Sequence, residues 1–558
     1  MLDHSTMAGM ILTLRENSRP GIRFQDTTVT HAAAVAGAAT RTAWLLSMRK
    51  PGPFHVAILS DNSVEYFLWL EAAALAGAAL VGANPTHRGE ELARDIAHTQ
   101  CQLLVVSEDY LNLVDGHHLG DGIGVVRRDS ERVFVIGSDQ AKDAVLPFLG
   151  ADALDVADET ITPNTLGYLL FTSGTSGAPK AVLCSQGRLA LISAVIPQMM
   201  SLTADDVFYA AMPFFHSNAL MTNWGPVLAT GATDVIPSTG KFSASGFLPD
   251  VRNYGVTYFN YVGKPLSYIL ATPEEHDDAD NTLRSCFGNE AASEDIERFA
   301  TRFGCTVTDA YGSSEGGAMV NRTPDTPPGA LGVAPEGTVV IDPETGRECP
   351  PAIFTDQGQL QNAEACIGEL VSKTGGTGFE GYWNNDEAMQ ARLKGGWYWT
   401  GDLAYRDAAG FFYFAGRDFD WIRVDGENFA AAPIERILQR HPSVILGAVY
   451  AVPDVHVGDQ VMATVEVHGT VEAFDGEGFG TFLAAQEDLG TKWAPKYLRI
   501  TEKLPMTVTS KVIKKSLRAE RWNTSDQVWW RPGNALDYVR ISETDVAMLN
   551  EATASRVL

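Results

Sequence analysis

Hydrophobic residues recur at helical spacing in two segments near the start of the chain, residues 31–48 and 64–82, and a short apolar run at 55–60 separates them. Apolar positions with a period of about 3.6 predict an amphipathic helix, whereas a short continuous apolar run predicts a buried strand. The same alternation returns as a predicted helix at 90–98 and a predicted strand at 101–107. Strands separated by helices indicate parallel α/β layers.

Further short apolar segments continue this series. They are FYAAMPFF, ATDVIPS, VTYFNYVG and TVTDAYG, and residues 167–185 are predicted to form two strands joined by a glycine-rich loop. From about residue 331 the sequence is richer in strands and turns. Near residue 416 a polar strand and turn lead into a short amphipathic helix, two apolar strands and another helix, an order typical of a small α+β unit.

The 558 residues leave room for several domains. We predict an α/β fold in which residues 1–416 form a large N-terminal domain of layered α/β subdomains plus a β-rich subdomain. Residues 417–520 are predicted to form a small α+β C-terminal domain. Residues 521–558 form a C-terminal extension to which the sequence assigns no role.

The composition narrows the class of protein. The 42 Lys and Arg residues against 69 Asp and Glu give a formal charge of −27, which argues against general nucleic-acid binding, because that needs a basic face. No stretch reaches the roughly 18–20 apolar residues of a membrane span, and the N-terminal apolar run is too short for a signal peptide. Six scattered cysteines are typical of reduced thiols. We therefore expect a cytoplasmic protein, with peripheral membrane contact and a homodimer left open.

Residues 172–180 have the composition of a phosphate-binding loop that follows an apolar strand. The residues that supply this chemistry are Thr172, Ser173, Gly174, Thr175, Ser176, Gly177 and Lys180. Glycines let the backbone approach a phosphate closely, hydroxyl and N–H groups donate to its oxygens, and a lysine supplies positive charge. The loop does not match the Walker A pattern. A flexible surface loop is the alternative interpretation.

A second candidate segment runs from Asp309 to Gly316. Tyr311 can stack on a base, Asp309 can accept a hydrogen bond from an exocyclic amine, and a hydroxyl next to a carboxylate suits Mg²⁺ with phosphate oxygens. The same segment also fits G-x-S-x-G, the nucleophile elbow of α/β-hydrolases, which must lead into a helix. Because the following sequence is broken by prolines, it disfavours the hydrolase hypothesis. A plain turn is the remaining alternative.

Three further candidates are weak when each is taken alone. Asp402 follows an aromatic run and can accept hydrogen bonds from the hydroxyls of a ribose. Arg417 opens the predicted small domain, and Lys511 lies in a basic cluster of an acidic chain. The structural alternatives are a turn carboxylate, a surface ion pair and a solvated charged face.

Seven segments, in this order, resemble the motifs of the adenylate-forming superfamily of acyl-CoA synthetases, luciferases and peptide-synthetase adenylation domains. They are SGTSGAPK, FFHSNAL, GNEAA, YGSSEG, YWTGDL, GRDFDWIRVDGEN and TSKVIKK, and the resemblance spans residues 50–520. The segments NPTHRGEELARDIAH and VDGENFAAAPIE most resemble those of the branch that holds fatty-acid transport proteins and long-chain or steroid-acid CoA ligases.

This resemblance implies an AMP-forming acid–thiol ligase. Such an enzyme uses ATP and Mg²⁺ to convert a carboxylic acid into its acyl-adenylate, and then passes the acyl group to coenzyme A. A fatty acid or a steroid side-chain acid is the implied substrate. The alternatives are a fatty acyl-AMP ligase that loads a carrier protein and a non-catalytic nucleotide-binding relative.

The resemblance also implies a role for each candidate residue. The loop 172–180 covers the β- and γ-phosphates, and the adenine pocket holds Asn289, Glu290, Ala291, Asp309, Tyr311 and Gly312. Asp402 and Arg417 bind the ribose, and Gly426 lies beside the pantetheine of coenzyme A. The catalytic group comprises Lys180, Ser314, Glu315 and Lys511, with Glu315 and Thr175 as Mg²⁺ ligands. The acyl pocket includes His216, Asn218, Gly263, Gly316 and Gly317.

By the same resemblance, the C-terminal domain is mobile and rotates between the two half-reactions, which brings Lys511 to the substrate in only one of them. The family has Asp or Lys at the hinge position. In this chain the position holds Phe419, between Asp418 and Asp420, so the resemblance does not fix the pivot.

Overall fold

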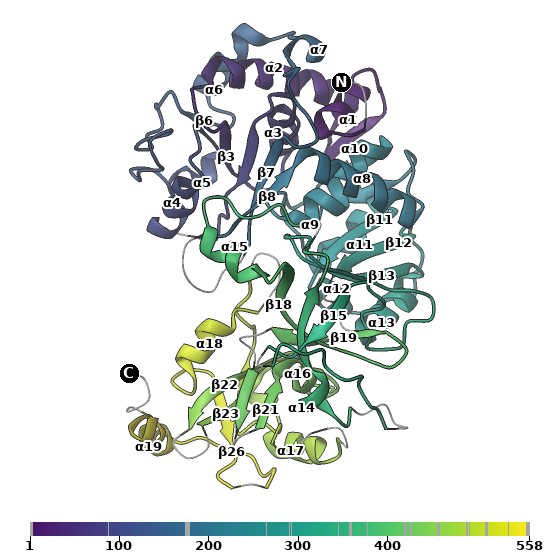
Figure 1. Ribbon diagram of the computed structural model, residues 1–558, viewed down its shortest axis with the longest axis vertical. Coiled ribbons are helices and arrows are strands. Elements are labelled where there is room, and N and C mark those ends of the chain that lie inside the picture. Colours follow the sequence, from purple (N-terminus) through teal and green to yellow (C-terminus); the bar gives the residue numbers. More distant parts are fainter. Residues whose placement is uncertain are drawn as a thin grey trace. The chain divides into compact units, whose positions relative to one another are not determined.

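The computed structural model describes residues 4–553 except for 88, 173–178, 264, 290, 292, 344, 356–359, 377, 418–420, 425–426, 455–457, 487–488, 490–491, 508–511 and 534. The chain divides into two compact units. The first comprises Met1–Gly316 and Thr377–Ala391, and the second comprises Gly317–Gly376 and Arg392–Leu558. Figure 1 shows helices layered on sheets in the part of the chain before residue 316, as the sequence predicts for an α/β fold.

The first unit contains a sheet with the strand order β6-β5-β3-β4-β7-β8. Its strands are β3 (His55–Leu59), β4 (Ala79–Gly82), β5 (Leu103–Val106), β6 (Val133–Val135), β7 (Leu166–Phe171) and β8 (Ala181–Ser185). All neighbouring pairs are parallel except β7 and β8, which are antiparallel. The parallel pairs confirm the α/β layers expected from the alternation of strands and helices.

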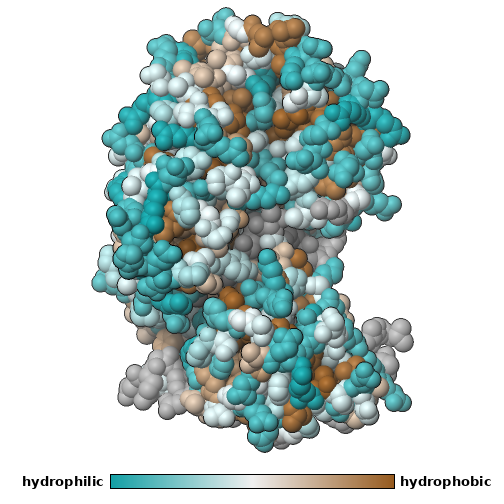
Figure 2. All heavy atoms as spheres, turned by 180° about the vertical axis from the view of Figure 1, so that it is seen from behind, coloured by the Kyte–Doolittle hydropathy of each residue, from teal (hydrophilic) through white to brown (hydrophobic). Residues whose placement is uncertain are grey.

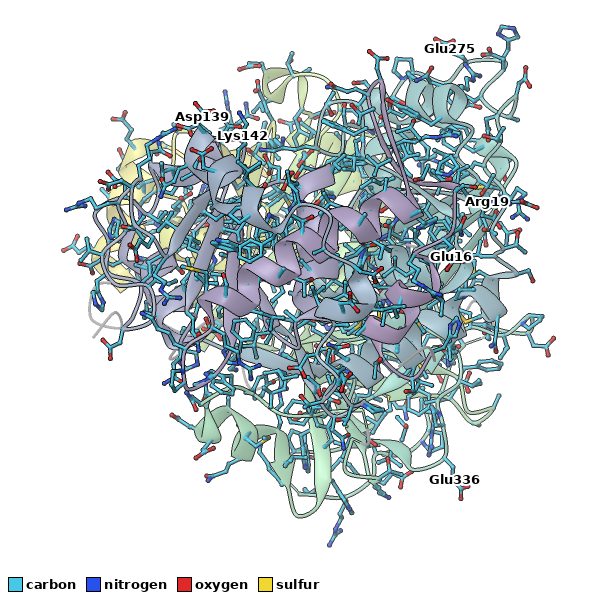
Figure 3. The ribbon with its side chains drawn as sticks, turned by 90° about the horizontal axis from the view of Figure 1, so that it is seen from above. Glu16, Arg19, Asp139, Lys142, Glu275 and Glu336 are labelled. Carbon is cyan, nitrogen blue, oxygen red and sulfur yellow. The ribbon has the colours of Figure 1, made fainter. Side chains whose placement is uncertain are left out.

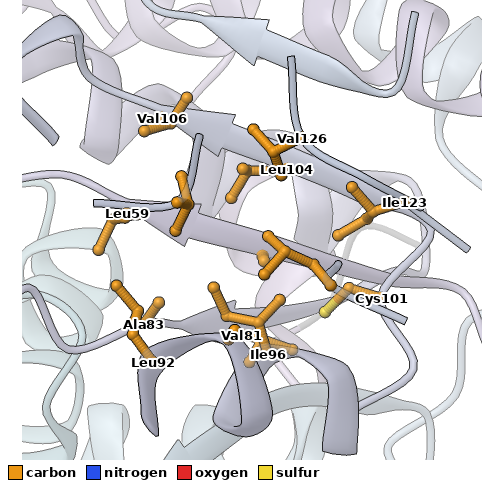
Figure 4. Close-up of a cluster of buried hydrophobic side chains, with 14 of the residues drawn as sticks. Leu59, Val81, Ala83, Leu92, Ile96, Cys101, Leu104, Val106, Ile123 and Val126 are labelled. Carbon is orange, nitrogen blue, oxygen red and sulfur yellow. The ribbon is translucent and has the colours of Figure 1, made fainter. Parts of the chain in front are cut away.

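Helices cover this sheet. They include α2 (His31–Met48), α3 (Val64–Leu75), α4 (Gly89–His98), α5 (Glu108–Leu111), α6 (Asp139–Val145), η1 (Leu146–Phe148) and α7 (Ala153–Val156). Figure 4 shows how α4 packs: Leu92 and Ile96 of the helix lie beside Ala83 and Val81 of β4, in a buried cluster that also contains Leu104. The burial of these side chains stabilises the layer, at roughly 25 cal/mol per Å² of apolar surface.

One predicted element is wrong in its extent. The helix expected over 64–82 ends at Leu75, and residues 79–82 form β4. Gly77 has a φ of +63° and ends the helix, because glycine adopts this left-handed conformation without a Cβ penalty. The following apolar run is fully buried in the sheet, so its hydrophobicity reflects a strand buried on both faces.

A second sheet of the first unit has the order β13-β12-β11-β9-β10-β1-β2. Its strands are β1 (Pro20–Phe24), β2 (Thr27–Thr30), β9 (Val207–Tyr209), β10 (Thr233–Val235), β11 (Tyr258–Val262), β12 (Ser285–Asn289) and β13 (Thr306–Gly312). Each neighbouring pair from β13 to β1 is parallel. The carboxyl ends of β11, β12 and β13 therefore meet at one edge of the sheet.

The helices of this second layer include one irregular segment. They are α1 (Met7–Thr13), α8 (Gln186–Met200), α9 (Ser217–Ala219), η2 (Leu220–Trp224), α10 (Gly225–Thr230), α11 (Ala244–Tyr254), α12 (Pro265–Leu270) and α13 (Ser293–Phe303). The η2 segment is a π-helix between α9 and α10. Such segments are rare and occur frequently at functional sites.

The second unit contains an antiparallel sheet, as expected from the strand-rich and turn-rich sequence after residue 331. It contains β15 (Thr338–Ile341), β16 (Gly368–Ser372), β17 (Leu393–Lys394), β18 (Trp397–Arg406) and β19 (Phe412–Arg417). The order is β15-β16-β18-β17, and β19 also pairs with β18. The short α14 (Ala363–Cys366) precedes β16, and β14 (Met319–Asn321) opens the unit.

The last sheet of the second unit has the order β21-β20-β23-β24-β25-β26, with β22 paired to β23. Its strands are β20 (Trp421–Val424), β21 (Glu427–Ala430), β22 (Val444–Asp454), β23 (Gly458–Val467), β24 (Tyr497–Thr501), β25 (Gln527–Trp530) and β26 (Val539–Arg540). The helices are α16 (Ala431–Gln439), η4 (Val471–Ala473), α17 (Gly476–Ala484), α18 (Lys514–Glu520) and α19 (Glu543–Thr553).

Residues after 520 form part of this sheet. β25 pairs with β24, and β26 pairs with β25, both antiparallel. Trp522, Trp530 and Tyr538 are buried in the apolar clusters of the sheet. The segment to which the sequence assigned no role therefore completes the C-terminal core, whereas the boundaries at 416 and 520 stay a prediction.

The face of the molecule shown in Figure 2 is mostly hydrophilic, with scattered hydrophobic patches. Charged side chains lie at the surface, for example Asp139 and Lys142, 3.1 Å apart on α6 (Figure 3). Among the described residues, no helix has the length and apolar character needed to cross a membrane. The six cysteines form no disulfide bond, and Cys101, Cys184, Cys286 and Cys366 are buried.

Candidate active site

Three parallel strands bring predicted nucleotide-binding residues to one edge of the second sheet. β11 ends just before Gly263, Asn289 is the last residue of β12, and Asp309 lies near the end of β13. Gly263 donates its N–H to the carbonyl of Asn289 (2.9 Å), and the Asn289 amide donates to the carbonyl of Ala310. In open α/β sheets, ligands bind outside the carboxyl ends of the strands.

Asp309 is buried and held from two sides. Its Oδ2 accepts a hydrogen bond from the Tyr261 hydroxyl (2.9 Å) and another from the Ala291 N–H (3.2 Å). Gly288 lies directly opposite Asp309 in the register, and a Cβ at this glycine would lie 2.5 Å from the Tyr261 ring. The missing side chain therefore leaves the space through which Tyr261 reaches Asp309.

The turn after β13 places a hydroxyl and a carboxylate side by side. The Ser314 hydroxyl lies 2.6 Å from the Ser217 hydroxyl, and the Ser314 carbonyl accepts from Arg188 Nη2 (2.6 Å). Gly316 has a φ of +70°, and a Cβ there would lie 2.5 Å from Arg188 Nη2. The left-handed backbone conformation favours glycine at this position, and a larger residue would also displace the Arg188 guanidinium.

Glu315 is the buried carboxylate of this turn. Its Oε1 accepts a hydrogen bond from the Tyr382 hydroxyl (2.9 Å). No group of three or more His, Cys, Asp or Glu side chains within the described ranges forms a metal cage. One carboxylate beside a hydroxyl fits Mg²⁺ nevertheless, because Mg²⁺ usually binds one or two carboxylates together with substrate phosphates.

The structure contradicts the hydrolase hypothesis for Gly312–Gly316. A nucleophile elbow leads directly from a strand into a helix. Every residue from 312 to 321 is described, and none of them is helical; the chain makes a turn and then enters β14. Ser314 therefore lies in a strand-to-strand turn.

The ends of the predicted phosphate loop lie close together. Thr172 follows β7, Lys180 precedes β8, and the Thr172 N–H donates to the Lys180 carbonyl (3.1 Å). Both side chains are half-buried. The loop residues Ser173, Gly174, Thr175, Ser176 and Gly177 lie outside the described residues.

His216 and Asn218 lie at the start of α9. His216 is the N-cap, and its Nδ1 accepts from the Asn218 N–H at 3.5 Å. The Asn218 side chain is buried: it accepts from Asn260 Nδ2 (2.7 Å) and donates to the Tyr261 carbonyl (3.4 Å). Asn223 in η2 in turn donates to Asn260 Oδ1 (3.3 Å). A chain of buried amides thus connects this helix to β11.

Asp402, Arg417 and Gly317 belong to the second unit. Asp402 is buried in β18 and lies directly opposite Arg417 of β19, so the register pairs two residues that the sequence separates by fifteen positions. A Cβ at Gly317 would lie 2.2 Å from the buried Tyr398 ring. The small size of Gly317 therefore accommodates Tyr398.

The profile of AMP-binding enzymes matches residues 15–383, which is more than half of the chain. The chain belongs to the AMP-binding enzyme family. This confirms the predicted membership of the adenylate-forming superfamily, and the matched region includes the phosphate loop, Asp309 and Glu315.

Several curated relatives of this AMP-binding enzyme align over nearly their whole length. The steroid-22-oyl-CoA synthetase of Rhodococcus jostii is 46% identical over 552 residues, which cover 99% of this chain and 97% of the relative. The medium/long-chain-fatty-acid–CoA ligase FadD17 of Mycobacterium tuberculosis is 45% identical over 540 residues, with coverage of 94% and 98%.

Solved structures support the fold of this AMP-binding enzyme. ATP-bound MatB from Rhodopseudomonas palustris superposes with a TM-score of 0.77 at 23% identity, over 92% of this chain and 98% of MatB. A benzoate CoA ligase from Burkholderia xenovorans LB400 gives a TM-score of 0.75 at 19% identity, with coverage of 92% and 99%. The predicted α/β fold class is confirmed.

Other predicted site residues of the enzyme also lie outside the described ranges. They are Glu290, Gly426 and Lys511, together with the hinge residues Asp418, Phe419 and Asp420. The sequence did not indicate three side chains that contact the candidate site: Arg188, Tyr261 and Tyr382. Each contacts a predicted residue across 48 to 126 positions of sequence, so local spacing carried no signal for it.

Proposed function

We propose that this AMP-binding enzyme is an ATP-dependent acyl-CoA ligase for a fatty acid or a steroid side-chain carboxylic acid. The observation that carries the proposal is the near full-length match, at 45–46% identity, to a steroid-22-oyl-CoA synthetase and to FadD17 ligases. Identity at this level, over 94% or more of both chains, supports a shared reaction and a related acid.

The nucleotide would bind at the edge of the second sheet where β11, β12 and β13 end. Asp309 would accept a hydrogen bond from the adenine amine, while Tyr311 stacks on the base beside Asn289, Ala291 and Gly312. The hydrogen bond from Tyr261 and the N–H of Ala291 fix the Asp309 carboxylate before ATP arrives. A carboxylate held in place loses less conformational entropy when it binds, which favours affinity. Asp402 and Arg417 would hold the ribose, in keeping with their opposed places on β18 and β19.

The first half-reaction brings two anions together, because the carboxylate of the substrate attacks the α-phosphate of ATP. Positive charge must offset the repulsion and the charge of the transition state. Lys180 and the loop 172–180 would hold the β- and γ-phosphates, and Lys511 would bridge the carboxylate and the α-phosphate. Glu315 and Thr175 would hold Mg²⁺, which supplies charge neutralisation at the phosphates, and the Ser314 hydroxyl would lie near the phosphates. Pyrophosphate leaves with the β- and γ-phosphorus atoms.

The second half-reaction exchanges oxygen for sulfur at the acyl carbon. The thiolate of coenzyme A attacks the carbonyl of the mixed anhydride, the bond between the acyl carbon and the bridging oxygen breaks, and AMP leaves. Gly426 would let the pantetheine pass close to the backbone, since glycine has no side chain. A mobile C-terminal domain that carries both Lys511 and Gly426 would let one site serve both half-reactions.

The acyl group would lie against α9 and the ends of β11 and β13. His216, Asn218, Gly263, Gly316 and Gly317 are the proposed contacts. The buried amides around Asn218 would supply fixed polar groups to the side of the acyl pocket formed by α9 and β11. Small-molecule sites usually combine a few such polar groups with apolar side chains.

A panel of acids tests the proposal. The purified protein is incubated with ATP, Mg²⁺ and medium-chain, long-chain, aryl or steroid side-chain acids, with and without coenzyme A. Mass spectrometry is expected to detect pyrophosphate and an acyl-CoA thioester from a fatty or steroid acid only when coenzyme A is present. Acyl-AMP without any thioester would overturn coenzyme A as the acceptor and favour a carrier protein. The absence of adenylate with every acid would overturn the proposed function.

A further inference from the structure

A segment that interrupts the second unit folds as part of the first. Residues 377–391 belong to the first compact unit, although the residues on either side of them in sequence belong to the second. Within this stretch, residues 378–385 run along β8: the Leu183 N–H donates to the Gly381 carbonyl (2.9 Å), and the Trp383 N–H donates to the Ala181 carbonyl (2.8 Å). We refer to residues 378–385 as the crossing segment.

Side chains fix the register of the crossing segment at both ends. The Glu380 carboxylate accepts from the N–H and from the hydroxyl of Ser185, both at 2.6 Å. The Asn385 amide donates to the Pro179 carbonyl (3.2 Å), directly beside Lys180. Hydrogen bonds to a charged group are stronger than neutral ones, so the Glu380 contacts resist sliding of the segment.

Tyr382 lies in the middle of the crossing segment and reaches the other side of the site. Its side chain is buried, and its backbone pairs in antiparallel fashion with Val182 of β8. Its hydroxyl group donates a hydrogen bond to Glu315 Oε1 (2.9 Å). Its ring packs edge-to-face with that of Phe379, with ring centroids 5.1 Å apart. One short segment therefore contacts both the end of the phosphate loop and the carboxylate proposed to hold Mg²⁺.

The turn that carries Glu315 is held from a second direction. Arg188 donates to the Ser314 carbonyl, and its Nη1 also donates to the Leu183 carbonyl (3.1 Å). Arg188 fixes the backbone of the turn, whereas Tyr382 is the described contact that fixes the Glu315 side chain. Because Oε1 accepts the Tyr382 hydrogen bond, Oε2 is the oxygen that Glu315 would offer to a metal ion.

We propose that Tyr382 is a positioning residue that holds the Glu315 carboxylate in the orientation required for Mg²⁺. The crossing segment aligns that carboxylate with Lys180 at the end of the phosphate loop. The inference rests on the proposed role of Glu315 as a Mg²⁺ ligand. Without the tyrosine hydroxyl, the carboxylate rotates among several positions, so more Mg²⁺ is needed to form the same complex.

The test measures binding of a non-hydrolysable ATP analogue by calorimetry over a series of Mg²⁺ concentrations. Tyr382→Phe removes only the hydroxyl, and the Mg²⁺ concentration that gives half of the maximal affinity is expected to rise about tenfold. The matched control is Tyr209→Phe, which also removes a buried hydroxyl donated to a carboxylate, Asp250 Oδ2 at 2.8 Å. This control is expected to leave the Mg²⁺ dependence unchanged.

Two further measurements separate positioning from stability. Thioester formation from supplied acyl-adenylate is expected to be normal in Tyr382→Phe, because that step needs no triphosphate. In a Glu315→Gln background, Tyr382→Phe is expected to add no further shift in Mg²⁺ dependence, as for two residues that act as a unit. An equal loss of analogue affinity at every Mg²⁺ concentration, shared by Tyr209→Phe, would show a merely structural role and overturn the inference.

The failure of this inference differs from the failure of the proposed function. An unchanged Mg²⁺ dependence in Tyr382→Phe, together with a large shift in Glu315→Gln, would overturn the role of Tyr382 alone. An unchanged Mg²⁺ dependence in Glu315→Gln would overturn the role of Glu315 as a metal ligand, and the inference with it.

Discussion

At the scale of single residues, the proposed adenine site depends on a contact made by Tyr261, a residue outside the family motifs. Tyr261 reaches Asp309 only because Gly288, its neighbour on the next strand, has no side chain. The motif that contains Asp309 was recognisable in the sequence. Its partner Tyr261 was not, because the position of Tyr261 relative to Asp309 is set by strand register.

Removal of the Tyr261 hydroxyl tests the role of this contact. Tyr261→Phe leaves Asp309 with one fewer donor, and a hydrogen bond to a charged group contributes about 1.5–3 kcal/mol. We expect the KM for ATP to rise at least tenfold while the KM for the acid is unchanged. The control is Tyr258→Phe on the same strand, whose hydroxyl donates to the Thr222 carbonyl (3.0 Å). Equal effects of both variants on ATP would contradict the assignment.

A methyl group at position 288 should be poorly tolerated. Gly288→Ala would place a Cβ 2.5 Å from the Tyr261 ring, so Tyr261 must shift away from Asp309. We expect a loss of about 1–3 kcal/mol in the free energy of unfolding, measured by urea denaturation, and weaker ATP binding. Gly447→Ala is the control, because its Cβ would lie at an ordinary 3.5 Å from Leu438. Identical urea midpoints for the two variants would argue against the steric account.

At the scale of elements, the sequence predicted the order of strands and helices better than their ends. The helix 31–48 and the hairpin across 167–185 are as expected, whereas the helix begun at residue 64 ends at Leu75, before a strand that is equally apolar. The crossing segment could not be predicted, since its place beside β8 depends on contacts such as that of Glu380 with Ser185, 195 positions away.

One strand carries a buried carboxyl group with a consequence for stability. Burial raises the pKa of Asp234 in β10 from its ordinary value of 3.8 to about 7. Between these pH values the unfolded chain has lost a proton that the folded chain keeps, so the free energy of unfolding falls as the pH rises. From this group alone we expect a fall of roughly 3 kcal/mol between pH 4 and pH 7.

Asp234→Asn removes this titration and keeps the shape of the side chain. We expect the urea midpoint of the variant to fall less steeply than that of the unmodified protein between pH 4 and pH 7. Well above pH 7 the two slopes should agree, because the native carboxyl is then ionised as well. Parallel slopes across the whole range would show that Asp234 is already ionised at pH 4 in the folded protein.

At the scale of the whole molecule, we propose that one site performs both half-reactions with the help of a mobile C-terminal domain. Fold, family and reaction class were predictable because seven motifs appear in the family's order. The identity of the acid was not, because the pocket wall depends on buried contacts such as the Asn218–Asn260 pair, which lies 42 positions apart in the sequence.

Lys511→Ala separates the two half-reactions. The variant should lose adenylate formation by a factor of at least about 10², since a positioned charge at the transition state contributes at least that much. Thioester formation from supplied acyl-adenylate and coenzyme A should be spared. Rapid-quench measurement of each step checks both expectations, and an equal loss in both steps would contradict the role given to Lys511.

The most direct test of the central claim follows an oxygen atom. The enzyme is given ATP, coenzyme A and a fatty or steroid acid labelled with ¹⁸O in its carboxylate, and the products are examined by mass spectrometry. If the carboxylate attacks the α-phosphate, one labelled oxygen remains on the AMP that leaves when the thioester forms. The account predicts labelled AMP, unlabelled pyrophosphate, and acyl-CoA that keeps the other labelled oxygen in its carbonyl group, all three in equal amounts. Thioester formation with unlabelled AMP would contradict an acyl-adenylate intermediate and, with it, the proposed function.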